Sequence, residues 1–249
     1  MTDDEKKLVH RFTELAERSF SGGIYTETEF LAPAEQALLK TNIRHVPYSF
    51  YGGYPDAEKA IAVFGSEELC GYEAEPPIVF LRISPTSLKF SEALSHRDFL
   101  GAILSLGIRR SVLGDLIVKE NRAYTVCLES IADYLCENVV SVRHTSVCCE
   151  RISSFPEDVL PVPLESSFVV MSERLDSVIA AIYKISRSES KDLIEHEKVL
   201  VGGAAELRAD YHPEPDDIIT VKSKGKFLYC GMEQETKKGR LRCRAKIYQ

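Results

Sequence analysis

Residues 173–201 read ERLDSVIAAIYKISRSESKDLIEHEKVLV, and this stretch decides the fold of the C-terminal part of the chain. Apolar residues recur from Leu175 to Ile182 at the spacing of one helix face, which predicts a short amphipathic helix. Ser186, with Glu189 three residues later, is typical of a capping box and predicts a second helix that runs to about Glu197. The alternating residues 199–201 then predict a half-buried strand that Gly202-Gly203 turns back.

Basic side chains gather at the junctions of these elements. Packing needs the apolar stripe, but it does not need a group of cations around one turn, which is what a phosphate backbone requires. The start of the second helix also presents free N–H groups that can receive an anion. We expect the contacts to come from Arg174, Lys184, Ser186, Arg187, Ser188 and Lys191.

The charge distribution supports this interpretation. The chain carries a net charge of −7, yet residues 1–171 hold 16 Lys and Arg against 25 Asp and Glu, whereas residues 172–249 hold 15 against 13. An acidic body with a basic end fits a tethered nucleic-acid-binding module. A strand at 217–221 precedes basic residues expected to add non-specific attraction, namely Lys222, Lys224, Lys226, Lys237, Lys238 and Arg240.

The bulk composition is that of a globular protein, with 44% hydrophobic and 28% charged residues among 249. The acidic start of the sequence does not resemble a signal peptide, and no apolar run approaches the ~18 residues of a membrane span. The seven cysteines lie mostly in apolar segments, which favours free thiols. We therefore expect a cytoplasmic protein.

The expected fold class is α+β with three domains. Residues 1–74 form an N-terminal α-rich domain, with helices at 4–19 and 32–40. Residues 75–165 form a middle domain, and residues 166–249 form the last domain with its basic extension. Residues 153–170 look like a linker, whose apolar end at 167–171 is an extended lead into the last domain.

The middle domain is predicted to follow a βαββαβ order. The strands are expected at 78–83, 115–118, 123–128 and 142–152, and the helices at 90–106 and 130–137. This ferredoxin-like order is shared by RNA-recognition domains and by enzymes. The third strand offers only Tyr124 as an aromatic, so base stacking on the sheet face would be weak.

The aromatic segment Tyr48–Pro55 has two interpretations. Three tyrosines, a phenylalanine and two glycines can pack around a tight turn, or they can stack on bases. Arg97, Arg109 and Arg110 are similarly either additional RNA contacts or solvated surface charges.

Catalytic patterns are weak. The triplet at residues 96–98 mimics a kinase catalytic loop, but Ile103 stands where that pattern needs Asn. Adjacent Cys148 and Cys149 suit neither zinc spacing nor a disulfide, and the histidines are scattered. We expect no catalytic residues, no metal, no cofactor and no small-molecule substrate.

The C-terminal pattern resembles the S4 RNA-binding domain over residues 172–228. The resemblance rests on Arg174-Leu175-Asp176, Ser186-Arg187, Lys191, Leu193-Ile194 and the strand after them. Glu197 stands where that family usually has Gly, Gly202 where it has Asn, and Asp216 where it has Gly. The helices, more than the hairpin, are therefore expected to carry the RNA contact.

The whole chain resembles the bacterial YlmH-like proteins. The resemblance rests on the segments FYGGYPDAE (50–58), HRDFLGA (96–102), LGIRR (106–110), GD (114–115) and TKKGR (236–240). It implies a non-enzymatic RNA-binding factor with an RRM-like middle domain. The implied partners are 23S rRNA and tRNA on the 50S subunit, in rescue of stalled subunits, and we expect a monomer. An RNA-modifying enzyme guided by its S4 domain and a cell-division-linked scaffold are the alternatives.

Overall fold

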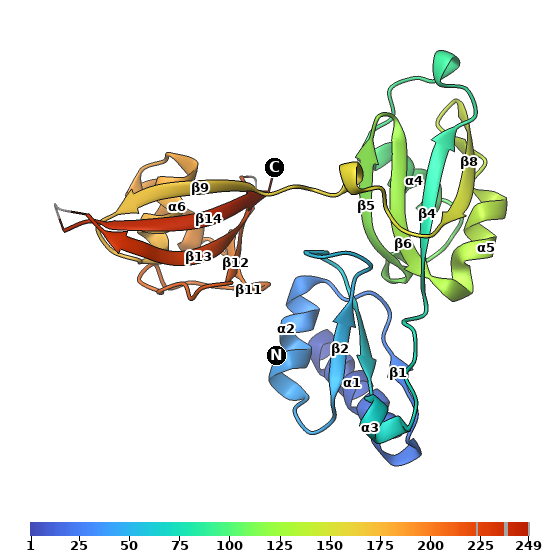
Figure 1. Cartoon of the computed structure of the whole chain (residues 1–249), viewed down its shortest axis with the longest axis horizontal. Helices are drawn as coiled ribbons and strands as arrows, with labels where there is room; N and C mark the ends of the chain where they lie inside the picture. Colours follow the sequence, from blue (N-terminus) through green and yellow to red (C-terminus); the bar gives the residue numbers. More distant parts are fainter. Residues whose placement is uncertain (223, 237–238, 249) are drawn as a thin grey trace. The chain divides into compact units, whose positions relative to one another are not determined.

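The computed structural model describes residues 1–222, 224–236 and 239–248. The chain divides into two compact units, Met1–Leu160 and Pro161–Gln249 (Figure 1). The expected separation of residues 1–74 from 75–165 falls inside the first unit and stays a prediction. Within the described residues, no helix has the length and apolar character needed to cross a membrane.

The N-terminal part of the first unit packs helices on a small sheet. Thr2 and Glu5 form a capping box that starts the first helix. Phe12, Leu39 and Phe64 are fully buried between the helices and the sheet. The elements are α1 (Asp3–Gly22), β1 (Thr26–Glu27), α2 (Pro33–Asn42), β2 (Tyr48–Tyr51), β3 (Ile61–Phe64) and α3 (Glu67–Cys70), with sheet order β1-β3-β2.

The rest of the first unit has the predicted βαββαβ order. Its elements are β4 (Ile78–Pro85), α4 (His96–Leu104), β5 (Leu113–Lys119), β6 (Arg122–Leu128), α5 (Glu129–Asn138), β7 (Ser141–Val142) and β8 (Thr145–Ile152), with the short helices η1 (Leu88–Phe90), η2 (Arg110–Val112) and η3 (Glu157–Val159). The sheet order is β5-β6-β4-β8-β7, and all neighbouring strands are antiparallel. With β7 only extending the edge, this is the ferredoxin-like arrangement.

Two predicted elements of this sheet differ from the structure. The helix expected at 90–106 begins only at His96, because Ser95 caps it and the Asp98 carboxylate accepts from the Ser95 N–H in return. The strand expected at 142–152 is a hairpin that turns at Arg143, whose φ is +52°. In both cases local polar and turn chemistry overrides the apolar pattern.

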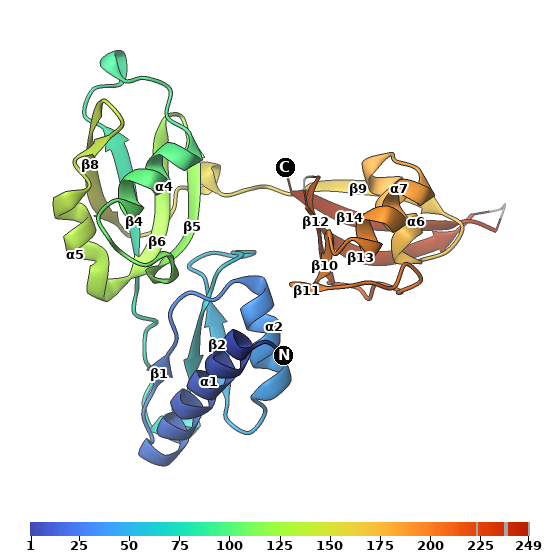
Figure 2. The same ribbon diagram turned by 180° about the vertical axis from the view of Figure 1, so that it is seen from behind.

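The two faces of this sheet are covered differently. Helices α4 and α5 lie on one face (Figure 2), where Leu81, Phe99 and Leu135 share a core. The opposite face carries Phe80 and Tyr124, and it is covered by Phe155, which follows β8, and by Phe30 from the N-terminal part. The Phe155 ring centroid lies 5.1 Å from that of Phe80 and 6.1 Å from that of Tyr124. The face that stacks bases in an RNA-recognition domain is therefore occupied by the chain itself.

The second unit is a six-stranded antiparallel sheet with two helices on one face (Figure 2). Its elements are β9 (Leu164–Val170), α6 (Leu175–Tyr183), α7 (Arg187–Glu195), β10 (Val199–Val201), β11 (Ala204–Ala205), β12 (Ile218–Val221), β13 (Gly225–Glu235) and β14 (Leu241–Tyr248). The sheet order is β11-β10-β12-β13-β14-β9. Helix residues such as Val178 and Ile194 are fully buried against Phe227 and Tyr229.

The structure refines two expectations for this unit. The segment expected as an extended lead is β9, which pairs with β14 from Val170↔Leu241 to Leu164↔Ile247. The second helix ends at Glu195 rather than Glu197, because Glu197 adopts a left-handed φ of +55° that closes the helix end.

Candidate nucleic-acid interface

A buried carboxylate lies beneath the predicted basic cluster. Asp176 sits in the first turn of α6 and is fully buried. Its Oδ2 accepts from Arg187 Nη2 at 2.8 Å, and its Oδ1 lies 3.3 Å from Arg174 Nε. Burial raises the pKa of Asp176, but the hydrogen bonds and charges of Arg187 and Arg174 outweigh burial and lower it. The two arginines are therefore fixed by an ionised carboxylate and remain partly exposed.

The turn between α6 and α7 presents cations without acidic partners. Lys184 ends α6 in a left-handed conformation, with φ of +53°. Lys191 lies one turn after Arg187 on α7, so both side chains share a helix face. Lys184 and Lys191 are exposed, and no carboxylate among the described residues pairs with either.

The start of α7 is capped on one side only. The Ser186 hydroxyl accepts from the Glu189 N–H at 3.0 Å, as predicted for an N-cap. The Glu189 carboxylate does not complete the predicted box, because it pairs with Lys224 Nζ at 3.1 Å. Ser188 is exposed in the first turn, where helix N–H groups remain available to an anion.

The lysine-rich loop after β12 docks on α7. Lys222 Nζ donates to the Glu197 carbonyl oxygen at 3.0 Å, and Lys224 reaches Glu189. Lys226 lies over the Tyr248 ring, 4.9 Å from its centroid. The structure thus brings the loop to the helices, although each of these lysines already has a protein contact.

Of the other predicted basic residues of this unit, the structure describes Arg240, which lies between β13 and β14. Arg240 is exposed, and its backbone N–H donates to Thr236 Oγ1 at 3.0 Å. Lys237 and Lys238 lie outside the described residues. The structure does not bring Arg240 into contact with α6 or α7.

The predicted contacts in the first unit do not form one cluster. Arg109 pairs with the Glu29 carboxylate, and Arg110 lies near Lys59, whose pKa is lowered by burial and, second, by the Arg110 charge. Arg97 is exposed in the first turn of α4 and has no acidic partner among the described residues.

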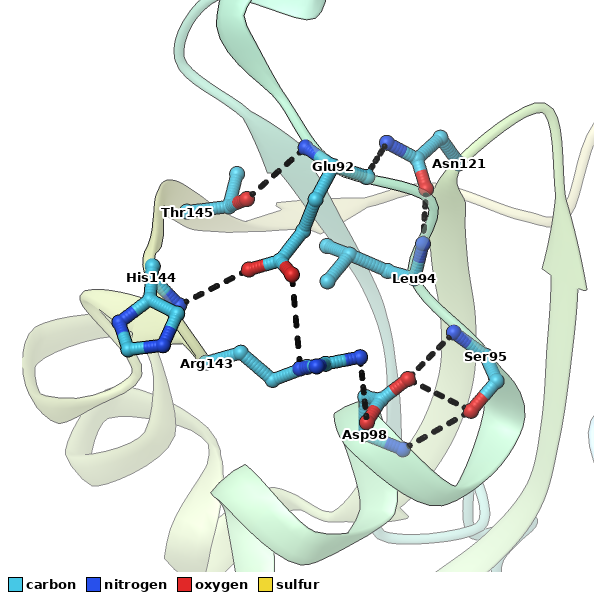
Figure 3. Close-up of polar contacts among 8 residues, drawn as sticks. All are labelled: Glu92, Leu94, Ser95, Asp98, Asn121, Arg143, His144 and Thr145. Carbon is cyan, nitrogen blue, oxygen red and sulfur yellow. Dashed lines mark hydrogen bonds and ion pairs between the residues drawn. The ribbon is translucent and has the colours of Figure 1, made fainter.

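A polar network holds the loop that leads into α4 (Figure 3). Glu92 Oε1 accepts from the His144 N–H at 3.1 Å, and its Oε2 lies 3.5 Å from Arg143 Nε. Arg143 also lies 3.8 Å from Asp98, and Asn121 accepts from the Leu94 N–H at 2.7 Å. The Arg143 charge is balanced by the carboxylates of Glu92 and Asp98. The network therefore holds the loop before α4 in place and adds little positive potential to the surface.

The aromatic segment at 48–55 is largely structural. Tyr54 donates to Asp115 Oδ2 at 2.8 Å, and Asp115 also accepts from the backbone N–H groups of Glu58 and Lys59. Burial, followed by the Asp115 charge, raises the pKa of Tyr54. Tyr51 is 39% exposed, so it is the tyrosine of this segment that keeps a surface for stacking.

The described fold therefore has a basic helix–turn–helix on a sheet, which is the arrangement of an S4 domain. Residues 173–219 match the S4 domain family model, and residues 78–155 match "Putative RNA-binding domain in YlmH". These two domain matches make the chain similar to the YlmH-like bacterial S4-domain RNA-binding proteins.

Two known proteins illustrate this relationship. The chain is 25% identical to the ribosome-associated protein quality control protein P2 of Bacillus subtilis (strain 168) over 221 residues, which cover 86% of this chain and 84% of that protein. The solved structure of the cell division protein ylmH from Streptococcus pneumoniae has a similar fold, with a TM-score of 0.51 and 18% identity over 61% of this chain and 93% of that chain.

Sequence reasoning missed three basic residues. Arg242, Arg244 and Lys246 alternate along β14 and point away from Cys243 and Ala245, which are buried. The alternation was visible in the segment LRCRAKIY, but it has meaning only once 241–248 is known to be a strand.

Proposed function

We propose that this protein binds structured RNA on the ribosome, through the helical face of its S4 domain. The expected targets are 23S rRNA and tRNA on the 50S subunit, and the expected role is in ribosome-associated quality control, in the cytoplasm and as a monomer. The observation that carries the proposal is the placement of Arg174 and Arg187 by the buried Asp176, on the same two helices as Lys184 and Lys191, which pair with no carboxylate among the described residues.

The geometry suits a phosphate backbone. Guanidinium groups held by a fixed carboxylate keep their outer N–H groups directed to solvent without the entropy cost of ordering a free side chain. The adjacent lysines and the start of α7 add positive potential in the same place. Support for the ribosome as partner comes from the Bacillus subtilis relative, which is a ribosome-associated protein.

We further propose that the protein acts by binding alone. The residues brought together at this face are phosphate-binding types, and their carboxylate is used as a structural anchor. An S4-guided RNA-modifying enzyme would require a modified nucleotide that is missing from cells without the protein.

Co-sedimentation of the full chain with 50S subunits tests the proposal. Lys184→Ala with Lys191→Ala removes two cations that hold no carboxylate, so the fold should be unchanged. We expect the fraction bound to fall several-fold at moderate salt, because each lost phosphate contact removes about one unit of salt slope. The matched control is Lys6→Ala with Lys7→Ala, which removes the same charge from α1.

Two results would contradict the proposal. The first is equal co-sedimentation of the lysine variant and the wild-type chain. The second is binding that survives nuclease digestion and high salt, which would indicate a protein scaffold in place of an RNA-binding factor.

A further inference from the structure

The second unit has a bare sheet face opposite its helices. Helices α6 and α7 pack on one side of the sheet, and Figure 1 looks onto the other side, where no helix of this unit lies. The strands β9, β12, β13 and β14 all contribute to this outer face. A sheet face is usually either packed against the core or polar. The side chains on this outer face therefore decide what the face can contact.

The outer face carries a row of cations. Because side chains alternate along a strand, the exposed Arg242 and Arg244, with the half-exposed Lys246, lie on one side of β14 while Cys243 and Ala245 enter the core. Among the described residues, none of these three cations forms an ion pair. In contrast, Arg174, Arg187 and Arg208 in the same unit are all paired.

The cross-strand partners of the two arginines on β13 and β9 carry no charge. Arg242 is flanked by Gln234 and Val169, and Arg244 by Gly231 and Ser167. The acids in the register pairs of β14 are Glu235, opposite Leu241, and Glu165, opposite Lys246. The partners directly opposite both arginines are therefore small or uncharged, and neither Glu233 in the β13 bulge nor Glu235 forms an ion pair with them.

We propose that the outer face of the second unit is a separate binding surface for an RNA phosphate backbone, centred on Arg242, Arg244 and Lys246. Alternate residues of a strand lie about 6.7 Å apart, which is close to the spacing of successive phosphates along a nucleic-acid strand. Guanidinium groups can each hold a phosphate through two N–H donors.

This surface rests on the proposed function, because it takes RNA as its ligand, but it uses residues on the face opposite to α6 and α7. An S4 domain with cations on both sides of its sheet can hold two RNA segments at once. The helical face would contact one segment and β14 the other.

The test is the salt dependence of RNA binding by the full chain. The probe is a fluorescein-labelled single-stranded RNA of mixed sequence, about 20 nucleotides long so that it spans more than one site. Arg242→Gln with Arg244→Gln should lower the slope of log affinity against log salt by about 1.4, since each phosphate contact contributes about 0.7 on a single strand. Arg242→Lys with Arg244→Lys should keep most of the slope.

Arg208→Gln is the control within the same unit. Arg208 is exposed but pairs with Glu206 at 3.0 Å, so its removal should leave the slope unchanged. Circular dichroism and thermal unfolding of each variant would show that the sheet is retained.

The outcomes separate this inference from the proposed function. If the glutamine pair leaves slope and affinity unchanged while Lys184→Ala with Lys191→Ala weakens binding, the outer face is not an RNA surface and the proposed function stands. If neither pair matters, both are wrong. If the glutamine pair binds the RNA normally but loses 50S subunits, the outer face meets an acidic protein, and the inference is overturned.

Discussion

Arg187 Nη2 donates to Asp176 Oδ2 at 2.8 Å, so a cation at the surface of the S4 domain is bound to an anion in its core. The pair therefore couples the stability of this unit to the proposed RNA contact. Arg187 compensates the buried charge of Asp176, and its side chain also faces solvent. Lys191, one turn later, has no such structural duty.

Arg187→Ala and Lys191→Ala should therefore behave differently. Arg187→Ala removes one of the two cations that compensate Asp176. Because both guanidinium groups are partly exposed and solvent screens them, we expect a loss of about 1–2 kcal/mol in the free energy of unfolding. Lys191→Ala should change stability by less than about 0.5 kcal/mol. Urea denaturation measures both, and equal stabilities would show that the Asp176 pair is not structural.

Acid should weaken the second unit through Asp176. Its pKa is lowered in the folded state, so the paired carboxylate stabilises the fold above its unfolded pKa. That contribution should be lost as pH falls below about 4, through the lowered folded pKa. Asp176→Asn should remove this part of the acid dependence. The measurement is thermal unfolding as a function of pH, and a variant with an unchanged profile would contradict the assignment.

Glu197→Gly should stabilise the second unit. Glu197 is held at φ +55°, where a side chain costs about 1 kcal/mol relative to glycine. The substitution also removes an acid beside the lysine loop, while the Glu197 carbonyl that Lys222 contacts is retained. We therefore expect higher thermal stability and tighter RNA binding. Glu197→Gln separates the two effects, because it should strengthen binding without raising stability.

Phe155→Ala should destabilise the first unit. Phe155 is 6% exposed and packs on Phe80, Tyr124 and Tyr54. Loss of a buried phenylalanine typically costs about 3–5 kcal/mol. Differential scanning calorimetry should show a lower transition for this unit only, with the S4 unit as an internal reference. A transition temperature close to that of the wild-type chain would mean that Phe155 packs only weakly against Tyr124.

The sequence predicts well what depends on near neighbours in the chain. The apolar spacing of 175–182 and the Ser186 cap define α6 and α7, and the βαββαβ order follows from the alternation of apolar runs. The apolar pattern predicted the start of α4 wrongly, at residue 90, because Ser95 caps the helix and makes it begin at His96.

Contacts between distant segments could not be predicted. No periodicity links β9 to β14 or places Phe155 over Tyr124, because these pairings depend on the whole sheet. In the candidate site, the basic residues were visible, but their partners were not. Asp176 reads as an ordinary first-turn acid of a helix, and only the structure shows it as the common anchor of two arginines.

The pairing of β9 with β14 also has a consequence for synthesis of the chain. Val170 leaves the synthesising ribosome long before its partner Leu241 exists, a delay of about 70 residues that makes this contact non-local. Until β14 has been made, β9 lacks its neighbouring strand, and its free N–H and C=O groups could pair with a strand of another chain. Helices α6 and α7 also lack Phe227 and Tyr229 at that stage, so the helical face gains its full core only after β13 has been made.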